Sequence, residues 1–507
     1  MAEDDSAAII GKDQIPRPLS AASQGGLLIK FLLNQEVREE AQLSPNMTVL
    51  NYLRTKAKKT GTKEGCGSGD CGTCTVILGE LNNGQLQYRS VNACLTFVSA
   101  LHGKQLITVE DLQSKDGSLH PVQQALVDFH GSQCGYCTPG IIMSMFALSK
   151  NRPQADKQDV LEFLSGNLCR CTGYRPIIDA ALSLCKKAPY QDQFAEQVQS
   201  TIDKLNSISN EPATLQFNNL SSFSPATINE LAELLQAYPH AHIVAGGTDL
   251  AVDVTQRHRE IESLIDVSRV MDMKVVNETN HHLVIGANVS LSDCFGVLNK
   301  HYPDFGEILR RFGSKQVRNQ ATLGGNIGNA SPIGDTPPLL IALDAGITLS
   351  RSGESRTIPV EDYYLGYKET ALRPSEFIKK IIIPKPEASK MFRAYKVSKR
   401  LGDDISAVCG GFNIELEDDT VTFARIAFGG MAEIPKRAVH CEQELIGKKW
   451  NIATINTAMA ALASDFEPLS DFRASKAYRN QTVANMLYRF FIEQQNSQIE
   501  TRVTSYV

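Results

Sequence analysis

The sequence predicts a multidomain α+β protein from three observations: its length, its ordinary composition and the change of hydrophobic pattern along the chain. At roughly 150 residues per domain, 507 residues provide three or four domains, each with its own core. Apolar residues make up 42% and charged residues 21%, as in typical globular proteins. Strand-like runs and helical patterns follow one another in varying order, which is typical of the α+β class.

Changes in pattern predict where one domain ends and the next begins. Residues 1–26 lack periodicity and are expected to form a mobile extension. A hairpin from Leu27, a helix around 48–56 and a strand at 73–78 predict a small α+β unit. Four helical patterns follow, near 121–130, 139–150, 156–165 and 176–186.

The second half of the chain predicts two further α+β domains. Helices alternate with short strands, and the last domain starts with strands at 406–415 and 421–428 and ends in helices around 451–463 and 481–493. A Gln-, Ser- and Asn-rich stretch before them is expected to be a linker, although part of it could be helical. The predicted division is a mobile extension at 1–26, an α+β unit at 27–107, a helical unit at 108–187, a linker at 188–219, and α+β domains at 220–388 and 389–507.

Charge and hydropathy exclude several classes of partner. The net charge of −5 comes without a long basic run, which argues against nucleic acid and anionic lipid. The acidic start is not followed by the apolar core of an export signal, and apolar runs such as 381–383 are too short to span a membrane. We therefore expect a cytoplasmic protein that binds small molecules or other proteins.

The first group of cysteines has the C-x4-C-x2-C…C spacing of plant-type ferredoxins. It consists of Cys66, Cys71, Cys74 and Cys94. A 2Fe–2S cluster needs two thiolates on each iron, and the glycines within 65–74 let a short loop bend around it. Structural zinc and unliganded buried thiols are the alternatives, although zinc loops usually pair cysteines in both halves. The spacing therefore predicts a 2Fe–2S cluster in a β-grasp, ferredoxin-like domain.

The second group of cysteines lies in the helical unit and consists of Cys134, Cys137, Cys169 and Cys171. A proline and a new helix follow each pair, so both pairs are expected at helix N-termini, which favour an anionic iron–thiolate cluster. The two similar halves indicate a pseudo-twofold bundle that holds the cluster between them. The spacing alone leaves zinc open, but the neighbouring first group favours a four-helix 2Fe–2S domain.

Two glycine loops in the second half offer backbone N–H groups suited to phosphate. They span 243–250 and 322–329, and Asp335 follows the second. Neither matches the G-x-G-x-x-G fingerprint, so a nucleotide site here would be of a non-Rossmann kind. A Gly-Gly pair by itself is more often an ordinary turn.

The two cysteine motifs in this order, with CGYCTPG and CRCTGYRP in the second, resemble the iron–sulfur half of the molybdenum hydroxylases, the xanthine dehydrogenase and aldehyde oxidase family. The glycine loops resemble the FAD domain of the same family, where two such loops straddle the pyrophosphate. The resemblance covers nearly the whole chain from Leu27. It implies an FAD-binding set of Ile243, Val244, Ala245, Gly246, Gly247, Thr248, Asp249, Leu250, Phe312, Thr322, Leu323, Gly324, Gly325, Asn326, Asp335, Ile378 and Lys396.

Two further positions match the family pattern. Gln133 matches a residue that hydrogen-bonds the pterin of a partner, although a loop glutamine that satisfies local backbone is as reasonable. Residues 400–405 match the loop beside the flavin, where charge influences whether nicotinamide or oxygen takes the electrons. Simple solvation is the alternative for the two acids in this loop.

The resemblance implies an electron-transfer subunit of an NAD-dependent xanthine dehydrogenase in purine catabolism. Nothing follows the FAD part, so a molybdopterin-binding large subunit is expected on a separate chain, in a heterodimer and then a dimer of heterodimers. That subunit would oxidise hypoxanthine or xanthine, and electrons would pass through the second cluster, the first cluster and FAD to NAD. No residue of this chain is expected to be catalytic on the purine.

Two other functions stay open at this point. A relative that oxidises aldehydes or other heterocycles would use the same electron-transfer chain with a different molybdenum partner. A stand-alone flavin reductase or redox sensor would have no catalytic partner. The fusion of the iron–sulfur and flavin parts in one chain favours xanthine dehydrogenase, but the sequence does not decide between NAD and oxygen as acceptor.

Overall fold

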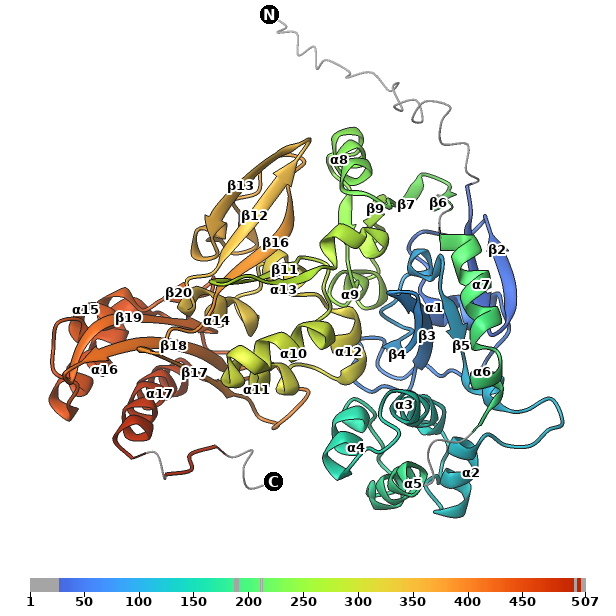
Figure 1. Ribbon diagram of the computed structural model, residues 1–507, viewed down its shortest axis with the longest axis horizontal. Coiled ribbons are helices and arrows are strands. Elements are labelled where there is room, and N and C mark those ends of the chain that lie inside the picture. The colour runs from blue at the N-terminus through green and yellow to red at the C-terminus, as the bar shows by residue number, and fades with distance from the viewer. Residues whose placement is uncertain (1–26, 187–190, 210, 212, 497–498, 503–507) are drawn as a thin grey trace, which may run out of the picture.

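The computed structural model describes residues 27–186, 191–209, 211, 213–496 and 499–502, so the predicted extension at 1–26 lies outside the described residues. The described chain forms four units that follow one another along the sequence (Figure 1). Two iron–sulfur candidates lie on one side of the molecule and two larger α+β units on the other. The multidomain α+β class predicted from the sequence is confirmed.

The first unit is a five-stranded sheet with a helix packed on it, as in the predicted β-grasp fold. The strand order is β2-β1-β5-β3-β4, and only β1 and β5 pair in parallel. Thr48 caps the helix by accepting a hydrogen bond from the Asn51 amide. The elements are β1 (Ile29–Leu33), β2 (Glu36–Glu40), α1 (Val49–Thr55), β3 (Thr75–Asn82), β4 (Gln85–Asn92) and β5 (Gln105–Ile107).

The second unit contains the four predicted helices. Three of the four begin with proline in their first turn, where the missing N–H costs no hydrogen bond. The second helix along the chain, α3, is buried along most of its length and forms the centre of the bundle, with Phe146 fully buried. The helices are α2 (Pro121–Asp128), α3 (Thr138–Asn151), α4 (Lys157–Leu164) and α5 (Arg175–Cys185).

The stretch predicted as a linker contains regular structure. It holds α6 (Gln193–Glu196), α7 (Val198–Ser209) and β6 (Ala213–Phe217). Asp192 caps α6 and also accepts hydrogen bonds from Lys150 and His120, at 2.7 and 3.0 Å. The hydrophobic pattern of this stretch is weak, because only a few residues of α7 are buried against the first unit.

The third unit contains two larger sheets, with helices between and around them, and a two-stranded sheet of β14 (Tyr364–Gly366) and β15 (Glu369–Thr370). One sheet has the order β6-β7-β9-β8, and the other has the order β10-β11-β16-β12-β13. Its strands are β7 (Leu220–Ser224), β8 (His242–Val244), β9 (Ser263–Asp266), β10 (Val276–Glu278), β11 (His282–Gly286), β12 (Gly346–Arg351), β13 (Glu354–Pro359) and β16 (Phe377–Pro384). Its helices are α8 (Ile228–Ala237), α9 (Leu250–Thr255), α10 (Leu291–His301), α11 (Pro303–Arg311), α12 (Lys315–Gln320), α13 (Leu323–Gly328) and α14 (Thr336–Ala342).

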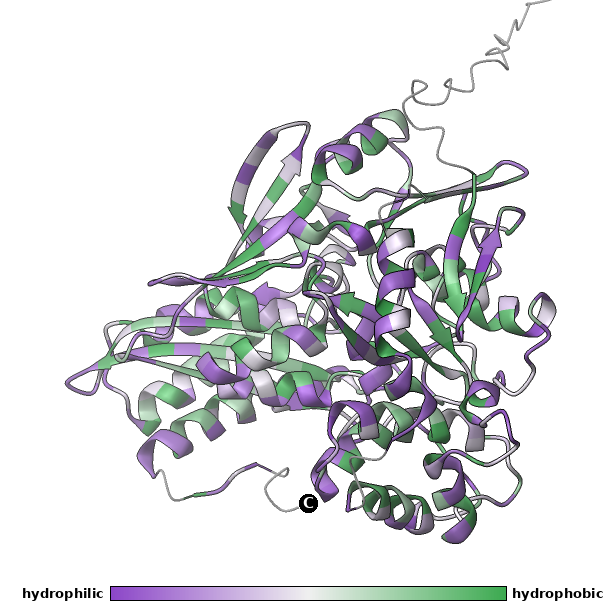
Figure 2. Ribbon diagram, turned by 45° about the vertical axis from the view of Figure 1, so that its right-hand side comes forward, coloured by the Kyte–Doolittle hydropathy of each residue, from purple (hydrophilic) through white to green (hydrophobic). Residues whose placement is uncertain are grey.

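The fourth unit packs helices on an antiparallel sheet. The strands β17 (Lys390–Val397), β18 (Val408–Glu417), β19 (Thr420–Gly429) and β20 (Lys436–Arg437) follow in chain order. The helices are α15 (Val439–Leu445), α16 (Ile452–Asp465) and α17 (Lys476–Gln495), which confirms the two strands and two helices predicted here. Figure 2 shows hydrophilic residues along the long helices, and no described helix is long and apolar enough to cross a membrane.

Candidate functional site

The first cysteine group brings its four thiols together in two pairs. Cys74 and Cys94 are buried, with their sulfurs 3.3 Å apart, and Cys66 and Cys71 are half-buried hydrogen-bond partners. The backbone amides of Ser68 and Cys71 each lie 3.4 Å from the Cys66 sulfur. The Cys71 thiol and the Ser68 donors lower the pKa of Cys66 to about 4. The Cys66 sulfur is therefore surrounded by hydrogen-bond donors, which favour its thiolate form.

The first cysteine loop packs against the helical unit by backbone contact. Gly72 has φ of +65°, and a Cβ at this position would lie 2.1 Å from the carbonyl oxygen of Gly166. A Cβ on Gly140, in the first turn of α3, would lie 2.1 Å from the carbonyl oxygen of Gly72. Only glycine fits such contacts, so these residues set how closely the two cysteine groups approach.

The second cysteine group pairs its thiols across the two halves of the bundle. Cys134 interacts with Cys171, and Cys137 interacts with Cys169. The pairs stand immediately before α3 and shortly before α5, as predicted. Cys134 and Cys171 are exposed, while Cys137 is half-buried and Cys169 is buried. Gln133 is exposed next to Cys134. This group therefore presents one edge to the surface.

Both groups have the donor set of a two-iron cluster. Each offers four free thiols arranged two by two, and 2Fe–2S clusters take two thiolates on each iron. Within the part of the chain that the structure describes, no three His, Cys, Asp or Glu side chains lie close enough to hold one metal ion. The arrangement of the thiols in two pairs per group is the observation that fits the predicted clusters.

Hydrogen bonds join the two cysteine groups directly. The amide of Leu168 donates to the carbonyl oxygen of Cys71 at 3.0 Å, so the backbone beside Cys169 touches the backbone of the first group. The Thr73 hydroxyl donates to the carbonyl oxygen of Tyr136 at 2.9 Å. The two candidate clusters therefore lie at neighbouring positions, with no layer of side chains between their loops.

A buried glutamine holds three units in register. Gln316, on α12 of the third unit, is fully buried. Its side-chain nitrogen lies 2.9 Å from both the Ser144 hydroxyl and the Asn167 carbonyl oxygen, and 3.3 Å from the Thr75 hydroxyl. The Asn167 amide in turn donates to the carbonyl oxygen of Gly72 at 3.0 Å. Gln316 belongs to no motif, so this role could not be predicted from the sequence.

The two glycine loops enclose a cavity of about 1130 Å³. A Cβ on Gly246 would lie 2.0 Å from the carbonyl oxygen of Gln320, so the first loop packs on the backbone that leads into the second. All the residues predicted for FAD line this cavity except Leu323. The Leu323 side chain is fully buried in the core of the third unit, and its place in the cofactor-binding set stays a prediction.

A buried ion pair fixes one wall of the cavity. Lys396 and Asp335 form an ion pair of 2.6 Å, and their side chains are 1% and 5% exposed. The Ser406 hydroxyl donates to the other carboxylate oxygen of Asp335 at 2.5 Å. Two donors hold this buried carboxylate in place, so the pair joins the loop after the second glycine motif to β17 of the fourth unit.

The cavity shares a wall with the first cysteine group. Ser68, Asp70 and Leu95, which stand next to cluster cysteines in sequence, line the same cavity as the glycine loops. A Cβ on Gly247 would lie 3.1 Å from the carbonyl oxygen of Leu95. These three residues could not be predicted as part of the cavity, because only the packing of distant segments brings them to it.

The loop at 400–405 also lines the cavity, as expected for residues beside a flavin. Asp403 has φ of +49°, and burial, reinforced by the charge of Asp70, raises its pKa to about 6. Lys399 donates to the carbonyl oxygen of Phe472 at 2.7 Å, which brings a second loop to the cavity. Phe472 and Arg473 carried no motif and were missed, although Phe472 is 77% exposed.

Comparison with protein families matches each unit in turn. Residues 33–99 match the family described as 2Fe-2S iron-sulfur cluster binding domain, and 108–182 match [2Fe-2S] binding domain. Residues 216–386 match FAD binding domain in molybdopterin dehydrogenase. Residues 393–494 match CO dehydrogenase flavoprotein C-terminal domain. The chain therefore contains two 2Fe–2S domains and an FAD-binding domain.

Individual relatives agree with these matches. A xanthine dehydrogenase of Emericella nidulans is 32% identical over 94% of this chain, and aldehyde oxidase 3 of Rattus norvegicus is 28% identical over 94%. The chain spans 39% and 40% of their lengths. A solved structure of carbon monoxide dehydrogenase from Hydrogenophaga pseudoflava is 27% identical, with a TM-score of 0.51 over 53% of this chain and 94% of that chain.

The ranges matched by the family comparison contain the cysteine groups and glycine loops described above. The two cysteine groups lie in the two 2Fe–2S domains, and the glycine-loop cavity lies in the FAD-binding domain. The chain belongs to the molybdenum hydroxylase family, of which it is the iron–sulfur and FAD component.

Proposed function

We propose that this chain is the electron-transfer subunit of an NAD-dependent xanthine dehydrogenase. Its partner in this proposal is a molybdopterin-binding large subunit that oxidises hypoxanthine or xanthine, and the two chains form a heterodimer that pairs into a dimer of heterodimers. The proposed place of action is the cytoplasm. The proposal includes the division into domains and the cofactor-binding residues predicted above.

One observation carries the proposal: three candidate redox sites follow one another without a break. The Leu168–Cys71 hydrogen bond joins the two cysteine groups, and Asp70 and Leu95 connect the first group to the flavin cavity. When bound, the clusters would supply one-electron carriers, and FAD would supply the site at which two electrons are collected for NAD. The chain's own residues hold the three sites at fixed spacing.

The residues of the cavity have separate tasks in this proposal. The amides of the loop at 243–250 bind the pyrophosphate, and the segment at 322–326, whose amides from 323 to 326 already donate within the chain, forms the facing wall of the site. Phe312 lies on the cavity wall where a ring system can stack. The buried Asp335–Lys396 pair keeps the wall rigid, and the loop at 400–405 faces the acceptor.

The exposed edge of the second cysteine group supports a partner on that side. Cys134 and Cys171 are exposed, and Tyr136, Leu168 and Tyr174 beside them are exposed apolar side chains. An apolar surface around a redox group is suited to a protein interface, because docking excludes water from it. We therefore assign this edge to the molybdenum subunit.

The test is to purify the native complex and assay it. We expect a co-purifying large subunit with molybdopterin, and oxidation of xanthine and hypoxanthine with NAD as acceptor. A fully assembled preparation with no such subunit would contradict the partner. Activity with aldehydes but not purines would contradict the substrate, and reduction of oxygen without NAD would contradict the acceptor.

A second candidate is the same electron-transfer role with an aldehyde-oxidising partner. The 28% identity to rat aldehyde oxidase 3 over 94% of this chain favours it, since it is close to the identity with xanthine dehydrogenases. The described residues themselves do not contact a purine in either case, so the assay of the complex separates the two candidates.

A further inference from the structure

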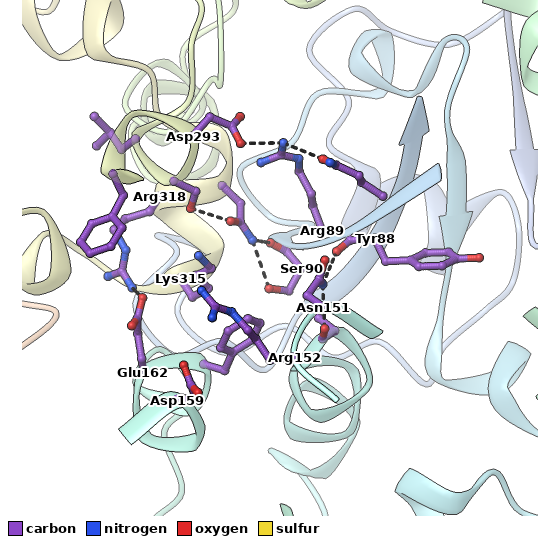
Figure 3. A pocket seen from close by; sticks show the side chains of 17 residues that line it. Tyr88, Arg89, Ser90, Asn151, Arg152, Asp159, Glu162, Asp293, Lys315 and Arg318 are labelled. Atoms are coloured by element: carbon purple, nitrogen blue, oxygen red, sulfur yellow. Dashed lines mark hydrogen bonds and ion pairs between the residues drawn. The ribbon is translucent and has the colours of Figure 1, made fainter. Parts of the chain in front are cut away.

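A second cavity, of about 230 Å³, lies where three units meet, apart from the flavin cavity. Its walls come from β4 of the first unit, α3 and α4 of the helical unit, and α10 and α12 of the third unit. Figure 3 shows its charged side chains, which come from all three units. About 10–15 Å³ of such space holds one water, so this cavity has room for a small solute.

Two of its cations are neutralised by acids. Arg318 lies 3.1 Å from Glu162, and its side chain is 4% exposed. Arg89 lies 2.5 Å from Glu80 and 2.9 Å from Asp293. The Arg318–Glu162 and Arg89–Asp293 pairs cross unit boundaries and hold the walls in place, and no charge of these two arginines is left without an acid.

Two other cations in the cavity have no such partner. No acidic oxygen lies within 4.0 Å of Lys315 or Arg152 in the described part of the chain, and Figure 3 shows both side chains directed into the pocket. Lys315 stands over the Phe163 ring, 5.4 Å from its centre, which fixes its direction. Burial, followed by the charges of Arg318 and Arg89 and opposed by those of Glu162 and Asp293, lowers the pKa of Lys315 to about 8.

The remaining acid of the pocket is already engaged. Asp159 accepts a hydrogen bond from the Asp156 amide at 3.3 Å, and the Asp159 amide donates to the Asp156 carboxylate at 2.9 Å. This capping box holds Asp159 at the start of α4 rather than on Lys315. The neutral side chains are also engaged, since Asn319 donates to the Ser90 carbonyl oxygen at 2.9 Å.

We propose that this pocket binds a free tetrahedral oxyanion of the phosphate or sulfate class between Lys315 and Arg152. Lys315 belongs to the flavin domain and Arg152 to the helical 2Fe–2S domain. An anion between them connects the two domains by charge-assisted hydrogen bonds and offsets the repulsion between the two cations that have no acidic partner. The site lies away from the three redox sites and does not depend on the proposed substrate.

The test uses isothermal titration of the purified full-length protein with potassium phosphate, against potassium chloride at matched ionic strength. We expect saturable binding of one phosphate per chain, and binding about tenfold weaker in Lys315→Gln and in Arg152→Gln. Arg152 is exposed, so its variant keeps its fold even if the lysine variant does not. Lys157→Gln, on the exposed face of α4 outside the pocket, is the matched control and should bind like wild type.

Thermal unfolding gives a second readout, because a ligand that binds only the folded state raises Tm. Phosphate should raise the Tm of wild type and of Lys157→Gln, and should leave that of Arg152→Gln unchanged relative to chloride. Absence of saturable phosphate binding in wild type overturns the proposal. Equal phosphate affinity in wild type and Arg152→Gln also overturns it, since the anion would then bind elsewhere.

Discussion

The two cysteine groups have the same donor set but opposite surroundings. In the first, Cys74 and Cys94 are buried in the core of the β-grasp unit, and their neighbours form a wall of the flavin cavity. In the second, Cys134 and Cys171 are exposed at the edge of a helical bundle. Under the proposed function this difference gives the electron path a direction, because the second group has exposed cysteines that a partner can approach, and neighbours of the first group line the cavity.

Cysteine-to-serine exchange should have the largest effect, and its effect on stability should differ between the two groups. Cys74→Ser should remove the first cluster and also destabilise the fold, by on the order of 1–3 kcal/mol, because it leaves a hydroxyl in an apolar core. Cys134→Ser should remove the second cluster with little loss of stability, since its side chain is exposed. Electron paramagnetic resonance and denaturant unfolding measure both effects.

The control for both variants is Cys185→Ser, because Cys185 lies in the last turn of α5 and belongs to neither group. It should keep both iron–sulfur signals. If Cys134→Ser also keeps both signals, the assignment of the second cluster is wrong.

The affinity for FAD should fall when a single methyl group is added to the first glycine loop. Gly246→Ala places a Cβ 2.0 Å from the Gln320 carbonyl oxygen, so the two glycine loops must move apart. Overpacking of about 1–3 kcal/mol corresponds to about a ten- to hundredfold loss of FAD affinity. Flavin fluorescence titration measures it. Gly402→Ala has open space around the new Cβ and should bind FAD normally; equal binding by both variants would argue against the loops as the FAD site.

The contact between the units should depend on Gln316. Gln316→Leu removes its hydrogen bonds to Ser144, Asn167 and Thr75, which keep only their bonds to one another and to Gly72, at a cost on the order of 1 kcal/mol. We also expect a weaker magnetic interaction between the two clusters, which pulsed electron paramagnetic resonance detects. Gln481→Leu on the exposed face of α17 is the control. An unchanged interaction in Gln316→Leu would limit this residue to local stability.

The smallest effect concerns the pH dependence of stability near the flavin cavity. The pKa of Asp403 is raised to about 6 by burial and by Asp70, against the favourable charges of Arg400, Arg318 and Lys396. An acid with a raised folded pKa binds its proton more tightly when folded, so stability falls as pH rises from about 4 through 6 and is level above. Asp403→Asn should lack this fall in Tm; a parallel pH profile in both proteins would contradict the raised pKa.

The sequence predicted the parts of the molecule that rest on local patterns. Cysteine spacing identified both groups, and the 3.6-residue period placed the helices of the second unit correctly. The order of glycine loops identified the cavity, apart from Leu323, whose side chain turns into the core because that motif starts a short helix.

Contacts between distant segments could not be predicted. Asp70 and Leu95 reach the flavin cavity, Gln316 reaches Thr75 across more than two hundred residues, and Phe472 comes to the cavity through Lys399. None of these residues carries a motif, and each acquires its role only from the packing of units. The stretch that holds α7 was predicted as a linker that could be partly helical, and its packing could not be predicted because its few buried residues acquire partners only in the folded chain.

The central claim is that one chain holds two 2Fe–2S clusters and one FAD in a line. The most direct measurement is iron, sulfide and flavin analysis of the purified full-length protein, combined with electron paramagnetic resonance of the reduced form. We predict two distinct 2Fe–2S signals that interact magnetically, and one FAD per chain. A single iron–sulfur signal, zinc in place of iron, or a protein with both clusters and no affinity for FAD would contradict the account.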